Sequence, residues 1–386
     1  MSVPRESGRY VISSTLGEEV RAFVPYDLPP QPSIAMDQNI KGLLEKALKQ
    51  IELLDLASQM VPNAEWFIYG FVRKEAVVSS QIEGTQATLV DLLSHEDEKT
   101  QTPDVKEVCN YLNALYLAIK EIKSKKGIPL SLRLIKKMHL VLMTGARGAN
   151  KNPGEFRTSQ NWIGGTRPGN ARFVPPPPNE MNSCLDKLEK YIYSEDETHP
   201  LIRAGLIHVQ FETIHPFLDG NGRLGRLLIT LLLQHWNLLK SPLLYLSLYF
   251  KRYRDEYYNR LNMARVDGDW EGWIAYYLEG VITIAKEATE TARKLFQIFE
   301  RDRKRIILLP KSTVPAIRLM ELLPDHPVVE ISRVTSLLEV TKPTAIKAVS
   351  QLTDLGVLKE STARKRDRKF VYKDYVDILS EETELG

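Results

Sequence analysis

A stretch of twelve residues, HPFLDGNGRLGR at positions 215–226, constrains the fold of this chain more than any other feature. It separates two segments in which apolar side chains recur at helical spacing. Residues 201–214 predict one helix, and the leucines within residues 224–232 predict a second, largely buried helix. Pro216 disfavours helical geometry at the residue before it, so the first helix should end at His215. The chain is therefore expected to bury two helices that are joined by a short polar loop.

The residue types of this loop suit a site that binds a phosphate group. Glycines let a backbone approach a ligand closely, and the free N–H groups at the start of the next helix favour anions. Arg223 and Arg226 are one helical turn apart and can face the same anion. Asp219 would suit Mg²⁺, which usually takes one or two carboxylates together with phosphate oxygens. His215 is the group that could take a proton near neutral pH. Each residue alone would fit an ordinary turn; the ordered set favours the phosphate site.

The ordered set resembles the signature of the Fic family, His-x-Phe-x-Asp/Glu-Gly-Asn-Gly-Arg-x-x-Arg, and every fixed position is matched. Such proteins typically transfer AMP from ATP to a protein hydroxyl. The resemblance implies that His215 is the general base, that Asp219 holds Mg²⁺, and that the two arginines bind the β and γ phosphates. The intact Gly-Asn-Gly-Arg favours nucleotidyl transfer over phosphate transfer. The loop residues expected to bind the nucleotide are Gly220, Asn221, Gly222, Arg223, Leu224, Gly225 and Arg226.

A second carboxylate of interest stands at the end of the helix predicted for residues 67–83. Val72, Ala76, Ser79 and Glu83 share one face of that helix, and Gly84 is a plausible stop. A carboxylate near a helix C-terminus is disfavoured by the dipole, and on a partly buried face it needs a cationic partner. From these observations alone, a surface glutamate in an imperfect register is an equally good interpretation.

The segment Ser79-Ser80-Gln81-Ile82-Glu83-Gly84 resembles the inhibitory pattern of the same family, Ser/Thr-x-x-x-Glu-Gly/Asn. The resemblance implies that Ser79, Glu83 and Gly84 form an inhibitory element and that Glu83 pairs with Arg226. The glutamate would then occupy the space that the ATP γ-phosphate needs and border the nucleotide site. The chain is therefore expected to inhibit itself.

Residues 145–180 contain six glycines and six prolines and show no helical period. They predict a long loop with one β-hairpin, its strands at Gln160–Ile163 and Ala171–Val174. Loops of this length in compact domains are usually functional, although an ordinary surface excursion remains an alternative. The loop resembles the family's flap, which lies over the active site and aligns the target segment. On that resemblance, the backbone of Ile163, Gly164, Gly165 and Thr166 is expected to contact the nucleotide as well.

The remaining segments predict helices around this core. Prolines in residues 1–37 predict an extended arm without regular helix. Four tyrosines of an aromatic-rich segment are expected to be mostly core residues, with an adenine-stacking role as the alternative. His139 and His208 are expected to be structural. The tyrosines are Tyr249, Tyr253, Tyr257 and Tyr258, and the further helices are expected at 40–54, 104–126, 131–142, 181–199 and 273–303.

The C-terminal segment predicts three helices and a hairpin formed by residues 357–360 and 369–373, an order that resembles a winged helix. Residues 311–373 hold 12 basic and 7 acidic side chains, a net charge of +5. This charge suits phosphate contacts with DNA, for which the wing residues Arg364, Lys365 and Arg366 are candidates. A winged helix that serves protein contacts or dimerisation is the alternative.

We therefore expect a mainly α protein: a Fic-type helical bundle with a β-hairpin flap, plus a C-terminal winged-helix module. The expected division is an N-terminal arm and helices with the inhibitory helix over 1–100, a catalytic domain over 101–300, and the winged helix over 311–386. The net charge of +3 gives no global drive toward nucleic acid or membrane. With two cysteines and no apolar leader at the N-terminus, a cytoplasmic protein is expected.

The expected activity is transfer of AMP from MgATP to a Ser, Thr or Tyr hydroxyl of a protein whose identity the sequence does not give. Self-modification, removal of AMP and a homodimer stay open. One alternative is a DNA-binding regulator that uses the Fic domain as a nucleotide sensor. Another is transfer of a different phosphorylated group, such as UMP or phosphocholine.

Overall fold

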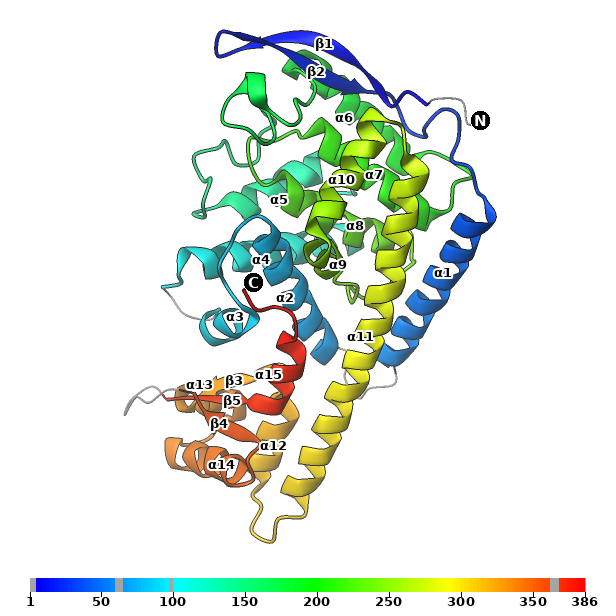
Figure 1. Ribbon diagram of the computed structural model, residues 1–386. Coiled ribbons are helices and arrows are strands. Elements are labelled where there is room, and N and C mark those ends of the chain that lie inside the picture. The colour runs from blue at the N-terminus through cyan, green and yellow to red at the C-terminus, as the bar shows by residue number, and fades with distance from the viewer. Residues whose placement is uncertain (1–4, 60–64, 97–99, 362–367, 386) are drawn as a thin grey trace.

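The computed structural model describes residues 5–59, 65–96, 100–361 and 368–385. Over these residues the chain is mainly helical, with two small antiparallel sheets (Figure 1). The helices that precede the signature are α1 (Gln38–Gln59), α2 (Glu65–Ile82), α3 (Leu89–His95), α4 (Pro103–Lys123), α5 (Leu132–Met143), α6 (Pro178–Tyr193) and α7 (Pro200–Ile214). Those that follow it are α8 (Asn221–His235), α9 (Ser247–Arg252), α10 (Arg254–Val266) and α11 (Trp270–Ile307).

The two helices that flank the signature form the centre of the bundle. Every residue of α7 from Leu201 to Ile214 is buried, as is most of α8. A helix that is apolar on all sides must be covered on all sides, and α7 packs against α6, α8, α11 and the strand β2 (Glu18–Pro25). The sequence prediction of two buried helices joined at this loop is confirmed.

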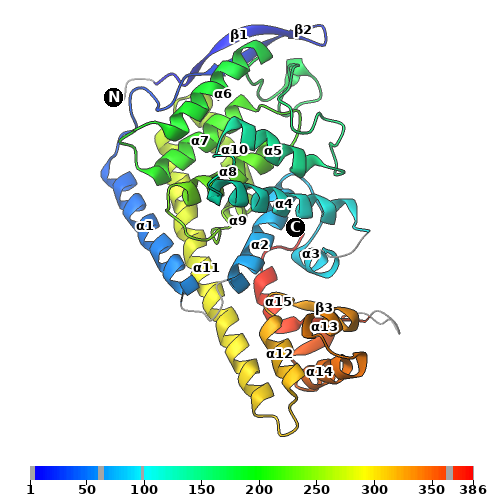
Figure 2. The same cartoon turned by 180° about the vertical axis from the view of Figure 1, so that it is seen from behind.

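The long helix α11 connects the bundle to the C-terminal module. Figures 1 and 2 show α1 lying along its upper half, while its lower half reaches the C-terminal helices. Asp302, fully buried near the lower end, accepts hydrogen bonds from the Tyr372 hydroxyl and from two arginines of α11 itself. This buried carboxylate fixes the helix to the module that follows it.

The N-terminal arm forms a hairpin, which the sequence prediction missed. Strand β1 (Gly8–Thr15) pairs with β2 in an antiparallel register from Gly8↔Pro25 to Thr15↔Glu18. Leu16 and Gly17 connect the strands with φ angles of 50° and 78°, the geometry of a tight two-residue hairpin turn. The prolines that exclude helix lie at and beyond the end of β2, where they leave the pairing intact.

The predicted hairpin of the flap is reduced to one bridge, between Ile163 and Phe173, beside a short 3-10 turn at Pro168–Asn170. The strand prediction was therefore wrong. Gly164 and Gly165 adopt φ angles of 68° and 73°, which bends the backbone away from a strand directly after the bridge. The far side of the loop pairs instead with the N-terminal hairpin, through the Phe23 N–H and the Val174 carbonyl (2.9 Å).

The C-terminal module follows α11. Its elements are α12 (Val314–Leu322), β3 (Val328–Glu330), α13 (Ile331–Leu338), α14 (Lys342–Asp354), β4 (Leu358–Glu360), β5 (Lys369–Tyr372) and α15 (Lys373–Ser380). The three strands form an antiparallel sheet in the order β3-β5-β4, which contains the predicted hairpin. Its interpretation as a winged helix stays a prediction, and Arg364, Lys365 and Arg366 lie outside the described residues. Within the described ranges, no helix combines the length and apolarity needed to cross a bilayer.

Candidate active site

The loop at the centre of the site begins with a left-handed residue. Helix α7 ends at Ile214, and His215 caps it with φ 49° and ψ 63°. This conformation is unfavourable for residues with a Cβ and persists only where the surroundings enforce it. The turn redirects the chain from the end of α7 into the loop that leads to α8.

Arg157, which the sequence prediction missed, holds this turn in place. Its side chain is almost fully buried and donates from Nε to the His215 carbonyl at 3.0 Å and from Nη1 to the Ser159 carbonyl at 3.1 Å. It also donates to the Pro176 carbonyl. Burial lowers the pKa of Arg157 to about 10, so the group remains a cation at neutral pH. One buried guanidinium thus ties the flap to the backbone of His215.

Asn221 and His139 close the loop around Phe217. The Asn221 side chain accepts from the Phe217 N–H at 2.9 Å and donates to the Phe217 carbonyl at 2.8 Å. His139 stacks on the Phe217 ring with centroids 3.8 Å apart. Its Nδ1 accepts from the Gly154 N–H, so Nε2 donates to the Asp219 carbonyl at 3.0 Å. His139 is structural, as predicted, while the Asn221 side chain closes the loop and leaves only its backbone to meet a ligand.

The His215 ring is kept neutral by its surroundings. Burial is the largest cause and the cations Arg265 and Arg157 add to it, which lowers the pKa of His215 to about 3. Its Nδ1 lies 3.9 Å from Oε2 of Glu212, a buried carboxyl one turn earlier on α7. Burial raises the pKa of Glu212 to about 7, with Arg226 opposing the shift. A neutral imidazole has a free lone pair and can accept a proton.

Asp219 stands immediately before α8, and its side chain is 40% exposed. Its Oδ1 accepts from the Gly220 N–H at 2.6 Å and lies 3.4 Å from Nη2 of Arg223. The described residues contain no cluster of three or more His, Cys, Asp or Glu side chains that could hold a metal ion. Asp219 could thus serve as a single protein ligand, which fits Mg²⁺ if phosphate oxygens and water complete its shell.

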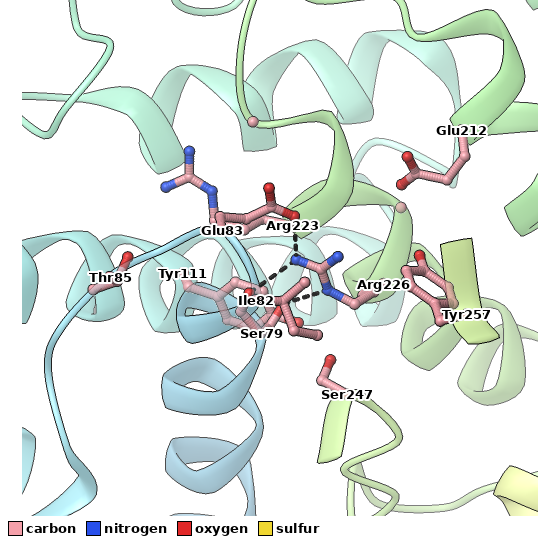
Figure 3. A network of polar contacts seen from close by, with 12 residues as sticks. Ser79, Ile82, Glu83, Thr85, Tyr111, Glu212, Arg223, Arg226, Ser247 and Tyr257 are labelled. Carbon is pink, nitrogen blue, oxygen red and sulfur yellow. Dashed lines mark hydrogen bonds and ion pairs between the residues drawn. The ribbon is translucent and has the colours of Figure 1, made fainter. Parts of the chain in front are cut away.

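Arg226 is held from two sides by the end of α2. Its Nε donates to the Ser79 hydroxyl at 2.9 Å, and Nη2 donates to the Ser79 carbonyl at 2.9 Å and to Glu83 Oε1 at 2.7 Å (Figure 3). Arg226 is 3% exposed, so it needs an anionic partner. A Cβ at Gly222 would collide with the Glu83 carboxylate, so a glycine at this position lets the carboxylate approach α8. The expected pairing of Glu83 with Arg226 is present.

Arg223 has a partner that sequence reasoning did not find. Its Nη1 donates to Oε1 of Glu107, a residue of α4 that is 1% exposed, at 2.6 Å. The same oxygen accepts the Thr85 hydroxyl at 2.8 Å, so Glu107 also binds the segment that follows Glu83. The sequence offered no signal for this role, because Glu107 and Arg223 are 116 residues apart and only the fold brings them together. Glu107 orients Arg223 at the start of α8.

The other predicted residues are divided between the loop and the flap. Leu224 is buried in the core, and the Gly225 carbonyl hydrogen-bonds to His208, which is structural as predicted. The flap residues Gly164, Gly165 and Thr166 are exposed. Asn161 Nδ2 donates to the Phe217 carbonyl at 3.0 Å and so links the flap to the signature loop. Of the four tyrosines, Tyr249 and Tyr257 are buried, while Tyr253 and Tyr258 are 47% and 38% exposed.

A polar loop at the start of a buried helix, with a neutral histidine, a carboxylate and two arginines, defines a candidate site for a phosphate-containing ligand. The sequence matches the Fic/DOC family N-terminal description over residues 42–120 and the Fic/DOC family description over residues 129–233. The chain is therefore similar to this family over the region that contains α2 and the signature loop.

Named relatives agree with that similarity. A "Protein adenylyltransferase Fic" of Drosophila ananassae is 30% identical over 182 residues, which are 47% of this chain and 32% of the relative. Another of Drosophila yakuba is 34% identical over 125 residues, 32% of this chain and 22% of the relative. The chain thus spans about a third or less of these relatives. A Fic family protein from Desulfovibrio desulfuricans G20 shares the fold, with a TM-score of 0.57 and 19% identity over 88% of this chain and 97% of that one.

Proposed function

We propose that this protein transfers AMP from MgATP to a hydroxyl group of a protein. The observation that carries the proposal is that Arg226, Arg223 and His215 all act on the Glu83 carboxylate, while Asp219 lies 3.4 Å from Arg223 at the start of α8. The relatives that match the chain bear the name protein adenylyltransferase, which supports the same reaction.

In the proposed reaction, the hydroxyl oxygen of the target attacks the α-phosphorus of ATP. The bond from that phosphorus to the bridging oxygen breaks, and pyrophosphate leaves. His215 would accept the hydroxyl proton on its neutral ring, and its pKa would have to rise when the substrate binds. Arg223 and Arg226 would bind the departing phosphates, and the first N–H groups of α8 would face the anion. Positioning and charge stabilisation would provide most of the rate enhancement.

Asp219 is the residue we assign to Mg²⁺ within this proposal. A magnesium ion bound there would neutralise charge on the phosphates. The hydrogen bond from His139 to the Asp219 carbonyl fixes the backbone that carries this carboxylate. Glu107 in turn fixes Arg223 on the other side of the carboxylate.

Glu83 acts as an internal inhibitor in this proposal. A phosphate would need the guanidinium face of Arg226 that the Glu83 carboxylate occupies, and two anions repel each other there. Ser79 keeps Arg226 in place from the other side. Because the inhibitory helix α2 belongs to the same chain, inhibition would need no partner.

The proposal is tested with ATP labelled at the α-phosphate. We expect the Glu83→Gly variant to label protein, itself or a target in lysate, more strongly than the unaltered chain. Label at the γ-phosphate should not transfer, and Glu83→Gly with His215→Ala should be inactive although folded. Equal labelling with and without His215 would contradict the assigned base. Competition by UTP or CDP-choline in place of ATP would identify transfer of another phosphorylated group.

DNA binding by the C-terminal module is a second candidate. The observation that favours it is the exposure of two lysines of α14, Lys342 and Lys347. Phosphate contacts by these lysines would weaken with salt. Salt-dependent binding of a duplex that survives His215→Ala but is lost in a variant with Lys342→Ala and Lys347→Ala would support it. No binding at low salt would exclude it and leave protein contacts or a homodimer as the module's role.

A further inference from the structure

The last residues of the chain bind the end of the inhibitory helix. Figures 1 and 2 show the C-terminus beside α2 and α3, far from the end of the module where α11 delivers the chain. Gln81 is the contact residue on α2, two positions before Glu83. Its Nε2 donates to the Thr383 carbonyl at 2.8 Å and to the Ala87 carbonyl at 2.9 Å. Thr383 is fully buried, so this tail is docked and not merely adjacent.

Helix α9 also contacts both the tail and Gln81 of α2. Lys251 donates from Nζ to Gln81 Oε1 at 2.7 Å and to the Glu384 carbonyl at 3.0 Å. Arg252 donates from Nη2 to Glu382 at 2.7 Å while it also holds Glu287 of α11. One lysine thus bonds both the inhibitory helix and the tail, and the neighbouring arginine ties the tail to the bundle.

Helix α15, which carries the tail, packs on α2 further upstream. The Leu379 side chain packs directly against the backbone of Gly70. A Cβ at position 70 would lie only 2.8 Å from that side chain, so α15 approaches α2 closely there. Lys369, at the start of β5, donates to the Ser94 carbonyl of α3 at 2.6 Å. The module is therefore joined to α2 at Gly70 and Gln81 and to the neighbouring α3 at Ser94, and the tail forms the contact nearest to Glu83.

We propose that residues 382–384 clamp α2 in its inhibitory position, so that release of the tail activates the enzyme. This inference rests on the proposed function, because it concerns the regulation of the same site. The physical reason is that Glu83 can reach Arg226 only while the last turn of α2 stays in place. Gln81 lies in that turn, and its bonds to Thr383 and Lys251 hold the turn from the side away from the signature loop. The C-terminal module thereby becomes part of the control of the active site.

The test uses three variants of the full chain: Gln81→Ala, Glu382→Gln, and a chain that ends at Ser380. The matched control is Glu381→Gln, since Glu381 is the same residue type one position earlier and makes no hydrogen bond or ion pair with the described residues. Two quantities are measured: hydrogen exchange of the amides of residues 79–85, and transfer of α-labelled AMP.

We expect faster exchange at residues 79–85 and roughly tenfold more transfer for Gln81→Ala and for the shortened chain, as loss of up to three hydrogen bonds would give. Glu382→Gln should show a smaller effect and Glu381→Gln none. In a Glu83→Gly background the same changes should not raise transfer further. Unchanged exchange, or an equal additional rise in the Glu83→Gly background, would overturn the clamp. Faster exchange with no transfer even from Glu83→Gly would support the clamp and contradict the proposed function instead.

Discussion

Glu83 and Arg226 lie 143 residues apart in the chain and meet at 2.7 Å between Oε1 and Nη2. The two side chains differ in exposure, since Arg226 is almost fully buried whereas 32% of the Glu83 side chain is exposed. Burial opposes ionisation of Glu83, but Arg226 outweighs it and lowers the pKa of Glu83. The buried cation needs an anion, and the exposed anion is the partner that can be replaced. Because Arg226 stays buried while Glu83 reaches the surface, a phosphate could replace the Glu83 carboxylate on Arg226.

The pair of Glu107 and Arg223 predicts a loss of both stability and nucleotide affinity. Glu107→Gln would remove the closer of the two carboxylates that pair with the buried Arg223 guanidinium, and loss of one partner of a buried pair typically costs up to about 3–5 kcal/mol. We expect urea unfolding to show a loss of that order. In a Glu83→Gly background the KM for MgATP should rise roughly tenfold, because Arg223 loses its fixed orientation. Glu290→Gln, which breaks an ion pair on the exposed face of α11, should change neither quantity. An unchanged KM would contradict the role given to Glu107.

A substitution at Arg157 is expected to lower kcat while leaving the affinity for MgATP unchanged. Arg157→Lys keeps the charge but cannot reproduce the planar set of bonds to the carbonyls of His215, Ser159 and Pro176. The left-handed turn at His215 should then relax. We expect kcat in a Glu83→Gly background to fall roughly a hundredfold, as a displacement of about 1 Å in the base would cause. MgATP affinity measured by calorimetry should stay within about twofold, since the arginines of α8 are untouched. Loss of affinity without loss of kcat would refute this assignment.

Burial of Glu212 is expected to lower the free energy of unfolding as the pH rises. Its pKa rises from an ordinary value of 4.5 to about 7 in the folded protein because the carboxyl is buried. The folded state is therefore not penalised below pH 4.5; the penalty grows between pH 4.5 and 7 and levels off at roughly 3 kcal/mol by pH 8. Glu212→Gln removes the ionisation. We expect the variant to gain stability relative to the unaltered protein between pH 5 and pH 8 in urea unfolding. A constant difference across that range would show that Glu212 ionises freely.

The sequence predicted elements whose signals are local. The spacing of apolar residues located α7 and α8, and Pro216 located the turn between them. The N-terminal hairpin was missed because Leu16-Gly17 lacks the usual Asn-Gly or Asp-Gly turn signal. The flap was predicted to hold two short strands, whereas Gly164 and Gly165 bend the chain directly after a single bridge.

For the site too, the sequence revealed local signals but not contacts between distant residues. The signature residues are contiguous, so their types alone predicted a phosphate site. Glu107 and Arg157 come from α4 and the flap, and they matter only because the fold brings them to Arg223 and His215. A buried carboxylate or guanidinium leaves no local pattern in one sequence. Partners that position functional groups across the bundle therefore require the structure.

The exchange of Glu83 for phosphate is tested most directly by MgATP calorimetry on the unaltered chain, on Glu83→Gly, and on Glu83→Gly combined with Arg226→Ala. We expect Glu83→Gly to bind MgATP at least roughly tenfold more tightly than the unaltered chain, because the Arg226 guanidinium becomes available. The added Arg226→Ala change should remove that gain. Equal affinity of the unaltered chain and Glu83→Gly for MgATP would contradict the account, since the carboxylate would then not occupy a phosphate position.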